Sequence, residues 1–329
     1  MSAKLHLTLA CGDYESIRAL KEGTVEADGI ELTVLTDMDS TTRHWRMLRG
    51  EEFDVAELSL SSYLMSADRD GPFTAIPVFL HRRFRHGFYF INAAAGIDEP
   101  KDLLGRNIGV KTYQATAILW MRGILEEEYG VPQTSVRWVR ELDEDVEFTP
   151  RPGLVIEQAP PGKLVEWMLA DGELDAVLHP DLIDPILQGD TRVRRLFEDY
   201  YAVERDYYAR TRIFPIMHVT AIRKEIVAEH PWVAWNLLRA FEASKAASYA
   251  RLENPRVVPL AWYRHYLDEE RAFMGPDPWE YGLGPANRKN LETAIRYSHA
   301  AGLIGREIPV EEIFLNPSAG MGRGDRKRI

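Results

Sequence analysis

The chain has 329 residues, of which 45% are hydrophobic and 28% are charged, and its formal net charge is -11. This composition predicts a soluble globular protein large enough for two lobes or for one large α/β domain. The acidic balance argues against a general nucleic-acid binder, which needs a basic face. Cys11 is the single cysteine, so no intramolecular disulfide can form. No window approaches the roughly 20 apolar residues of a membrane span, and the N-terminal apolar run is too short for a signal peptide. A cytoplasmic protein is therefore expected.

The first part of the chain alternates short strands with helices. Apolar and polar residues alternate over residues 5–11, which predicts a first strand, and Asp13 stands where the N-cap of the next helix is expected. Further strands are predicted at residues 30–35, 53–58, 76–80 and 87–91, with helices at 13–21 and 41–49 and a helix start at 59–64.

A second unit with the same alternation follows. Its predicted helices are residues 98–103, 115–129 and 165–169, and its predicted strands are residues 107–110, 135–139 and 176–178. Residues 141–153 are acidic and unpatterned, so they are predicted to form a surface loop. The chain then returns in extended form at 214–222, is helical at 231–251, 260–267 and 285–301, and is expected to be disordered at 320–329.

Strands that alternate with helices predict mainly parallel sheets in an α/β fold. The helices of the first unit come in part from the C-terminal third of the chain. This pattern predicts a discontinuous first lobe (residues 1–91 and 216–329) and an inserted second lobe (residues 92–215). Two crossings, near residues 88–93 and 212–218, would form a hinge with a cleft between the lobes.

The most informative segment is Arg212–Val219, an apolar run that is broken by Pro215 and His218. A histidine in a strand that crosses between lobes would face the cleft, where ligands bind. His179 also follows a predicted strand that approaches the cleft. Histidine exchanges protons near neutral pH, so both residues are candidates for acid–base chemistry. A buried structural role is the alternative for each, and it is favoured for His179.

Three strand-to-helix turns carry polar side chains at the carboxyl ends of predicted strands, where open α/β sheets bind ligands. They are Gly12–Tyr14, Ser59–Ser62 and Lys111–Thr116. The second and third offer hydroxyls and backbone N–H groups at helix starts, which suits a carboxylate. Ordinary N-capping is the alternative for any single turn, but matching turns in two lobes favour joint anion binding.

The strongest basic cluster is His81–His86, which includes Arg82 and Arg85 and lies just before the first crossing. Arginine binds a carboxylate with two parallel hydrogen bonds, and a dianionic ligand would need such groups in an acidic protein. A solvated loop with surface ion pairs is the alternative.

Several cofactor motifs are absent from the sequence. No Cys/His cluster has zinc spacing, and there is no glycine-rich dinucleotide or phosphate-binding motif after a strand. The sequence therefore gives no support for a metal, a redox cofactor or nucleotide hydrolysis.

Seven blocks of the sequence stand out together as motifs: Leu9–Tyr14, Phe53–Tyr63, Ala75–Phe79, Tyr113–Thr116, Arg122–Leu125, Ile213–His218 and Arg296–His299. With them the chain resembles the 4,5-dihydroxyphthalate decarboxylase family from about residue 5 to residue 316. The resemblance implies a two-lobed, periplasmic-binding-protein-like (type II) α/β fold with two mainly parallel sheets. It also implies an enzyme, a carboxy-lyase that converts 4,5-dihydroxyphthalate to protocatechuate and CO2.

The resemblance implies roles for the candidate residues. A general acid protonates the ring carbon that bears the leaving carboxylate while a para hydroxyl releases electrons, so no cofactor is needed. His218 is the predicted proton donor, and His86, Asp13 or His179 would take the hydroxyl proton. The substrate-binding residues are predicted to be Tyr14, Ser61, Ser62, Arg82, Arg85, Tyr113, Gln114, Thr116 and His179, with the arginines and helix starts on the two carboxylates and the tyrosines beside the ring.

Two other functions fit the same fold. One is a non-catalytic binding protein for an aromatic carboxylic acid, and the other is a different lyase or a dehydratase that acts on a cyclic acid. The expected partner is a small aromatic diacid, with no nucleic acid and no membrane, and the sequence leaves a homo-oligomer open.

Overall fold

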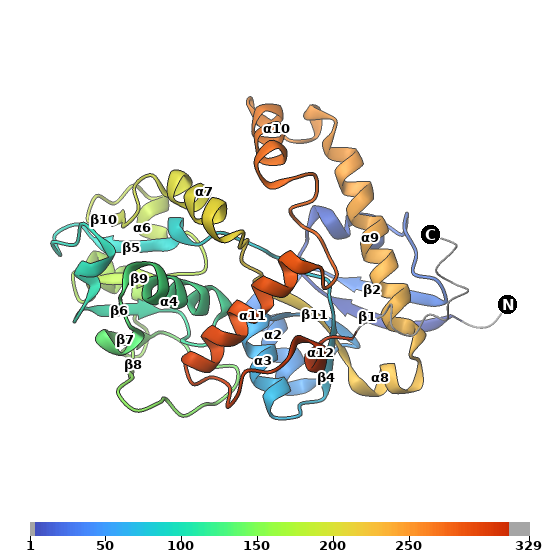
Figure 1. The fold of residues 1–329 in the computed structure, drawn as a ribbon, viewed down its shortest axis with the longest axis horizontal. Coiled ribbons are helices and arrows are strands. Elements are labelled where there is room, and N and C mark those ends of the chain that lie inside the picture. The colour runs from blue at the N-terminus through green and yellow to red at the C-terminus, as the bar shows by residue number, and fades with distance from the viewer. Residues whose placement is uncertain (1–3, 316–329) are drawn as a thin grey trace.

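The computed structural model describes residues 4–315, which form two α/β lobes (Figure 1). The tail at residues 320–329, for which disorder was predicted, lies outside the described part of the chain. The predicted fold class is confirmed, because each lobe is built on one mainly parallel sheet flanked by helices.

The sheet of lobe 1 has five strands. Their spatial order is β2 (Ile30–Leu35), β1 (Leu5–Ala10), β3 (Val55–Ser59), β11 (His218–Arg223) and β4 (Phe73–Ile76). β1 runs parallel to β2 and β3, whereas β11 runs antiparallel to both of its neighbours. β3 is central and every one of its residues is buried, as expected for a strand covered on both faces.

The sheet of lobe 2 has six strands. Their order is β10 (Val193–Arg195), β5 (Tyr89–Asn92), β9 (Ala176–Leu178), β6 (Asn107–Val110), β7 (Arg137–Arg140) and β8 (Val155–Gln158). β9, β6, β7 and β8 are parallel, and β5 runs antiparallel to β9 and β10. Each sheet thus contains one reversed strand, and in both lobes it is the strand that follows a crossing.

Helices cover both sheets. In lobe 1 they are α1 (Arg18–Lys21), α2 (Ser40–Gly50), α3 (Leu60–Asp68), α8 (Lys224–Glu229), α9 (Trp232–Leu252), α10 (Tyr263–Met274), α11 (Pro285–Ala300) and α12 (Val310–Ile313). In lobe 2 they are α4 (Thr116–Tyr129), α5 (Val165–Ala170), α6 (Asp184–Leu187) and α7 (Tyr200–Thr211). Short 3-10 helices stand at Glu15–Ile17, His86–Phe88, Pro100–Leu103, Gln133–Ser135 and Pro255–Val257. No helix among residues 4–315 is long and apolar enough to span a membrane.

The two crossings lie next to each other. An isolated antiparallel bridge joins Arg82 to Ile216, and the Met217 N–H donates to the carbonyl of His81 (2.9 Å). The expected lobe boundary after residue 91 falls inside β5, whose pairing places it in the sheet of lobe 2. The first crossing therefore ends before Tyr89.

Helix α11 contacts both lobes, since it packs on α3 and on α4 (Figure 1). Two of the sequence motifs meet at this contact. A Cβ added to Gly123 on α4 would overlap the ring of Tyr297 on α11, so only glycine allows the two helices to approach this closely. The C-terminal segment, which was predicted to belong to lobe 1, therefore also packs on lobe 2 through α11.

Several elements differ from their predicted positions. The strand expected at residues 76–80 lies at Phe73–Ile76, and the helix expected at 13–21 divides into a 3-10 turn and α1. The predicted N-cap is wrong: Tyr14 holds that position, and no side chain caps the turn. β8, β10, α6 and α7 were not predicted, because they are short or, as in α7, polar around most of the helix.

Candidate active site

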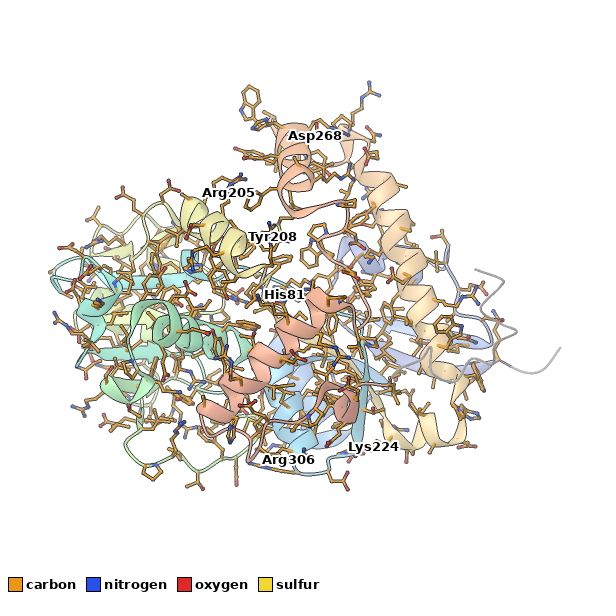
Figure 2. All side chains as sticks on the ribbon, viewed as in Figure 1. His81, Arg205, Tyr208, Lys224, Asp268 and Arg306 are labelled. Carbon is orange, nitrogen blue, oxygen red and sulfur yellow. The ribbon has the colours of Figure 1, made fainter. Side chains whose placement is uncertain are left out.

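A cavity of about 110 Å³ lies between the lobes, beside the crossing segments. Both lobes line it, lobe 1 from α2, β3 and β11 and lobe 2 from the turn after β6, the start of α4 and the loop 141–154. The lining residues are Ser40, Thr41, His44, Ser59, His81, Arg85, Lys111, Thr112, Ala115, Thr116, Ala117, Leu142, Asp145, Pro180, Asp181, Met217 and His218. Figure 2 labels one of them, His81, near the middle of the molecule between the two lobes.

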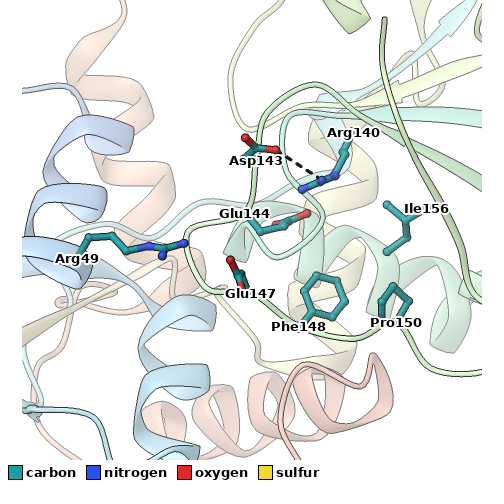
Figure 3. Close-up of a pocket in the computed structure, with 8 residues that line it drawn as sticks. All are labelled: Arg49, Arg140, Asp143, Glu144, Glu147, Phe148, Pro150 and Ile156. Atoms are coloured by element: carbon teal, nitrogen blue, oxygen red, sulfur yellow. Dashed lines mark ion pairs between the residues drawn. The ribbon is translucent and has the colours of Figure 1, made fainter. Parts of the chain in front are cut away.

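A larger hollow of about 570 Å³ lies beside the same loop (Figure 3). It is lined by Arg49, Arg140, Asp143, Glu144, Glu147, Phe148, Pro150 and Ile156. Half of these side chains are charged residues of the loop and its flanks, and no histidine is among the described lining residues. The smaller cavity, which is lined by three histidines and a buried arginine, is therefore the candidate active site.

His218 is bound to a buried carboxylate. It is the first residue of β11, directly opposite Ser59 of β3, and its Nδ1 lies 2.6 Å from Oε1 of Glu57. The side chain of His218 is 12% exposed and that of Glu57 is fully buried. Because Nδ1 is engaged with the carboxylate, Nε2 is the nitrogen left for the cavity, as in other carboxylate-oriented histidines.

Glu57 is the centre of a buried hydrogen-bonded network. Tyr14 donates its hydroxyl to Oε1 (2.7 Å), while Arg43 and the Gly12 N–H donate to Oε2 (2.8 Å each). Burial alone would raise the pKa of the Glu57 carboxyl, but His218, Arg43 and Tyr14 outweigh it and hold the pKa well below its usual range. The carboxylate is therefore ionised and can compensate the positive charge of an imidazolium at His218.

Two further histidines stand edge-on to His218. The ring centroids of His44 and His81 are each 4.8 Å from the centroid of His218. Burial, together with the positive charges nearby, lowers the pKa of His44 well below its usual value and that of His81 to about 2. Both rings are therefore neutral near pH 7, which leaves His218 as the histidine of this cluster that is paired with an anion.

Three of the predicted site residues line the cavity: His218, Arg85 and Thr116. Arg85 is 2% exposed, and its guanidinium donates to the carbonyl of Pro180 (2.7 Å) and to the sulfur of Met217. Thr116 joins the lobes, because its hydroxyl lies 2.8 Å from that of Ser59 and accepts from the Ser61 N–H (2.9 Å).

Five predicted residues lie behind the cavity wall instead of lining it. Tyr14 acts through Glu57, and the buried hydroxyl of Ser62 donates to Asp145 (3.3 Å). Tyr113 donates its hydroxyl to Gln133 (2.6 Å) and stacks on Phe148, so its ring is part of the core of lobe 2. The other two are Ser61, which is fully buried, and Gln114, whose backbone N–H donates to Glu144.

The structure leaves Arg82 and Asp13 out of the cavity. The guanidinium of Arg82 is buried and donates to the carbonyl of Glu280 (2.9 Å) and to Asn287, so it ties the crossing to the start of α11. Asp13 is exposed and forms an ion pair with Lys21 (2.9 Å).

Two predicted histidines also lie outside the lining. His86 packs among the rings of Tyr89, Phe197 and Tyr207 in lobe 2, where burial lowers its pKa to about 4. His179 is buried with Nδ1 at the backbone of Asp181. Both are held by the packing of lobe 2 rather than presented to a ligand.

One functional residue that was not predicted, Glu57, does have a recognisable sequence pattern. Glu57 is the single charged residue in the apolar strand Val55–Ser59, and a carboxylate in a buried strand requires partners. The sequence pattern around His44 does not reveal it, because α2 buries the polar residues Arg43 and His44 and leaves the aromatic Trp45 56% exposed. This is the reverse of what an amphipathic pattern predicts. Among the described residues no three His, Cys, Asp or Glu side chains are placed to hold a metal ion.

Solved structures share this architecture and define its class. The alkanesulfonate-binding protein SsuA from Xanthomonas axonopodis pv. citri aligns with a TM-score of 0.56 at 12% identity, covering 96% of this chain and 99% of that one. A periplasmic sulfonate-binding protein SsuA from Methylobacillus flagellatus KT gives 0.58 at 12% identity, with 97% and 94% covered. The fold is therefore that of the two-lobed periplasmic binding proteins.

Sequence relatives define the family within that class. The 4,5-dihydroxyphthalate decarboxylase of Comamonas testosteroni is 37% identical over an alignment of 321 residues, which covers 95% of this chain and 97% of that protein. A protein of the same name from Pseudomonas putida is 38% identical over 213 residues, covering 62% and 82%. No family model matches the chain. The chain belongs to the 4,5-dihydroxyphthalate decarboxylase family, as its motifs predicted, and is a carboxy-lyase.

Proposed function

We propose that the protein removes one carboxylate from 4,5-dihydroxyphthalate to give protocatechuate and CO2 in the cavity between the lobes. The observation that carries this proposal is His218, held through Nδ1 by the buried Glu57 and lining the cavity. It occurs in a chain that aligns over 95% of its length with a 4,5-dihydroxyphthalate decarboxylase.

The chemistry of this substrate suits an acid catalyst. Each ring carboxylate is para to a hydroxyl, and electron release from that hydroxyl makes the carboxylate-bearing carbon basic. The imidazolium of His218 donates its Nε2 proton to that carbon, the carbon–carboxylate bond then breaks as CO2 leaves, and the electron pair restores the aromatic ring. His218 regains a proton from water. Throughout these steps the Glu57 carboxylate keeps the ring of His218 in place.

The start of α4 supports the binding of the retained carboxylate. Ala115, Thr116 and Ala117 line the cavity, and among the described residues no side chain caps this 14-residue helix. Its first N–H groups lack intrahelical partners and carry the positive end of the helix dipole. Lys111, which precedes the helix and pairs with Glu141 (2.8 Å), adds a cation to the same wall.

Arg85 would act on the substrate through its charge. Its hydrogen bonds to Pro180 and Met217 are already made, so it does not offer a free fork for a carboxylate. A buried cation beside the cavity still favours an anionic ligand over a neutral one, because the field is weakly screened there.

The experiment is to incubate the protein with a panel of hydroxylated aromatic mono- and diacids and to measure CO2. We expect release from 4,5-dihydroxyphthalate, and His218→Gln should lower kcat by about 10²-fold or more, since a positioned acid contributes ~10² to 10⁴. His299→Gln is the matched control, because His299 is 46% exposed on α11, and it should leave turnover unchanged.

Other outcomes would redirect the proposal. Tight binding of a diacid without release of CO2 would indicate a binding protein, like the solved structures of this fold. Elimination of a group other than CO2 from the bound acid would indicate another lyase. Turnover of His218→Gln at the wild-type rate would remove His218 from the mechanism.

We also propose a cytoplasmic location. It is supported by the single cysteine, Cys11, which is free. Fractionation of producing cells tests this location.

A further inference from the structure

The loop 141–154 carries a carboxylate into the active-site cavity. Asp145 is partly buried and is one of the lining residues. Its Oδ2 accepts a hydrogen bond from the hydroxyl of Ser62 (3.3 Å), which lies on α3 of lobe 1. The sequence predicted only a surface loop here, so a lobe 2 segment supplies a polar group that was not expected.

The loop is fixed to both lobes. On the side of lobe 2, the carboxylate of Glu144 accepts from the N–H groups of Tyr113 (2.8 Å) and Gln114 (3.0 Å). On the side of lobe 1, Arg49 donates to the carbonyl of Asp145 (3.0 Å), and Figure 3 shows Arg49 reaching from α2 toward the loop. Arg69 likewise donates to the carbonyl of Glu147 (2.6 Å). Asp145 therefore stands where the loop joins the lobes.

The surroundings of Asp145 raise the pKa of its carboxyl group. Burial raises its pKa, and the Ser62 hydrogen bond and the Arg49 charge offset this only in part. The other charged or titratable groups that line the cavity are His44, His81, Arg85, Lys111, Asp181 and His218. A carboxylate with a raised pKa exchanges protons closer to neutral pH than an exposed one does.

Few groups in the cavity could take a proton from a substrate hydroxyl. His44 and His81 line it, but burial lowers the pKa of both rings, which makes them weak proton acceptors. The bases predicted from the sequence, namely His86, Asp13 and His179, do not line it. Of the two aspartates that do, Asp181 is 72% exposed and is paired with Arg83 (3.5 Å). Asp145 is the remaining carboxylate.

We propose that Asp145 is the catalytic base that accepts the proton of the hydroxyl para to the leaving carboxylate. This rests on the proposed decarboxylation. The O–H bond breaks toward Asp145, the oxygen becomes a carbonyl, and the ring carbon takes the proton of His218. When CO2 leaves, the carbon–carboxylate electron pair returns to the ring, and the oxygen takes its proton back from Asp145. The net reaction consumes one proton, which His218 recovers from water.

The test is Asp145→Asn, with Asp143→Asn on the same loop as the matched control, since Asp143 is 94% exposed. We expect kcat of Asp145→Asn to fall by about 10²-fold or more at neutral pH. The deficit should narrow as pH rises, because the substrate hydroxyl then ionises without help. A merely structural role would give the same deficit at every pH.

The outcomes distinguish failure of the proposed decarboxylation from failure of the role of Asp145. A wild-type protein that releases no CO2 overturns the proposed function itself. An active wild type, together with an Asp145→Asn variant whose kcat falls less than about tenfold or by the same factor at all pH values, overturns the role of Asp145 alone. If Asp145→Asn does not fold, Ser62→Ala carries the test: loss of this hydrogen bond raises the pKa of Asp145, so the acid limb of kcat should move to higher pH, and an unmoved limb overturns the proposal.

Discussion

The two lobes follow one topological plan and place different chemistry at its centre. The order β2-β1-β3-β11-β4 in lobe 1 corresponds to β7-β6-β9-β5-β10 in lobe 2, with β8 added at the edge. The central strand of lobe 1 carries the buried Glu57, whereas the corresponding β9 is wholly apolar and buried. The same scaffold thus supports an ionised network in one lobe and an ordinary core in the other.

This difference assigns separate tasks to the lobes. Lobe 1 compensates a buried carboxylate with Arg43, Tyr14 and His218, which suits proton transfer. Lobe 2 keeps its buried His86 neutral and offers the uncapped start of α4, which suits anion binding. In the proposed mechanism lobe 2 also supplies Asp145, so the groups that bind the substrate and move its protons come together only in the cavity that the lobes share.

The largest effect should come from removing the charge at the centre of lobe 1. Glu57→Gln leaves Arg43 buried without its partner, which typically costs about 3–5 kcal/mol of stability, and it leaves the imidazolium of His218 without compensation. We expect kcat of the folded protein to fall by about 10²-fold or more. Turnover per folded molecule, with the folded fraction taken from thermal unfolding, measures it.

Asp54→Asn is the control for that variant. Asp54 directly precedes β3 and accepts from the N–H (2.8 Å) and the hydroxyl (2.9 Å) of Thr8, away from the cavity. It should lower stability without lowering turnover per folded molecule. Equal losses of turnover in the two variants would contradict a specific role for Glu57.

A smaller effect is expected from the neutral histidine of lobe 2. Because the pKa of His86 is lowered to about 4 in the folded protein and is ~6.5 in the unfolded chain, the unfolded state binds the proton first as pH falls. Stability is full above about pH 6.5 and declines by roughly 3 kcal/mol down to about pH 4. The His86→Phe variant has no such group to protonate, so its free energy of unfolding should fall by roughly 3 kcal/mol less than that of the wild type between about pH 6.5 and pH 4. Urea unfolding at several pH values measures this difference.

The matched control replaces an exposed histidine. The side chain of His6 is 76% exposed on β1, so His6→Phe should keep the pH dependence of the wild type. A His86→Phe variant that loses as much stability on acidification as the wild type does would show that His86 is not held neutral by burial.

The smallest effect should come from a hydroxyl that joins the lobes. Thr116→Val removes the hydrogen bonds of the Thr116 hydroxyl with the hydroxyl of Ser59 and with the N–H of Ser61, and it weakens the contact between the lobes by about 1 kcal/mol. We expect KM to rise roughly fivefold while kcat stays within about threefold. Thr220→Val is the control, because the hydroxyl of Thr220 donates to the carbonyl of Val78 (3.1 Å) inside lobe 1. An unchanged KM in Thr116→Val would contradict a role for lobe closure in binding.

Much of the fold could be predicted because local pattern and tertiary structure agree. The strand Leu5–Ala10 alternates as predicted, and α4 ends at Tyr129, as predicted, because Gly130 adopts the left-handed C-cap conformation (φ 67°). α7 was missed because its tyrosines and arginines give no apolar stripe, and only the lobe against which it packs makes it a helix.

The candidate site was predicted less completely than the fold. His218, Arg85 and Thr116 were found because each stands at a crossing or a helix start, which are positions that a sequence pattern reveals. Arg82 stands three residues before Arg85 with the same chemistry, yet it is committed to Glu280 and Asn287. Nothing in a local pattern tells which of two neighbouring arginines meets a partner about 200 residues away.

The sequence by itself determined the family, the two-lobed α/β architecture and the presence of a histidine at the second crossing, because motifs and periodicity are local properties of the chain. Only the tertiary structure decided that Glu57 holds this histidine, that His44 and His81 surround it, and that the loop 141–154 brings Asp145 to the same cavity. The physical reason is that hydrogen bonds and charge interactions act over a few ångströms in space, and folding brings together residues that lie far apart along the chain.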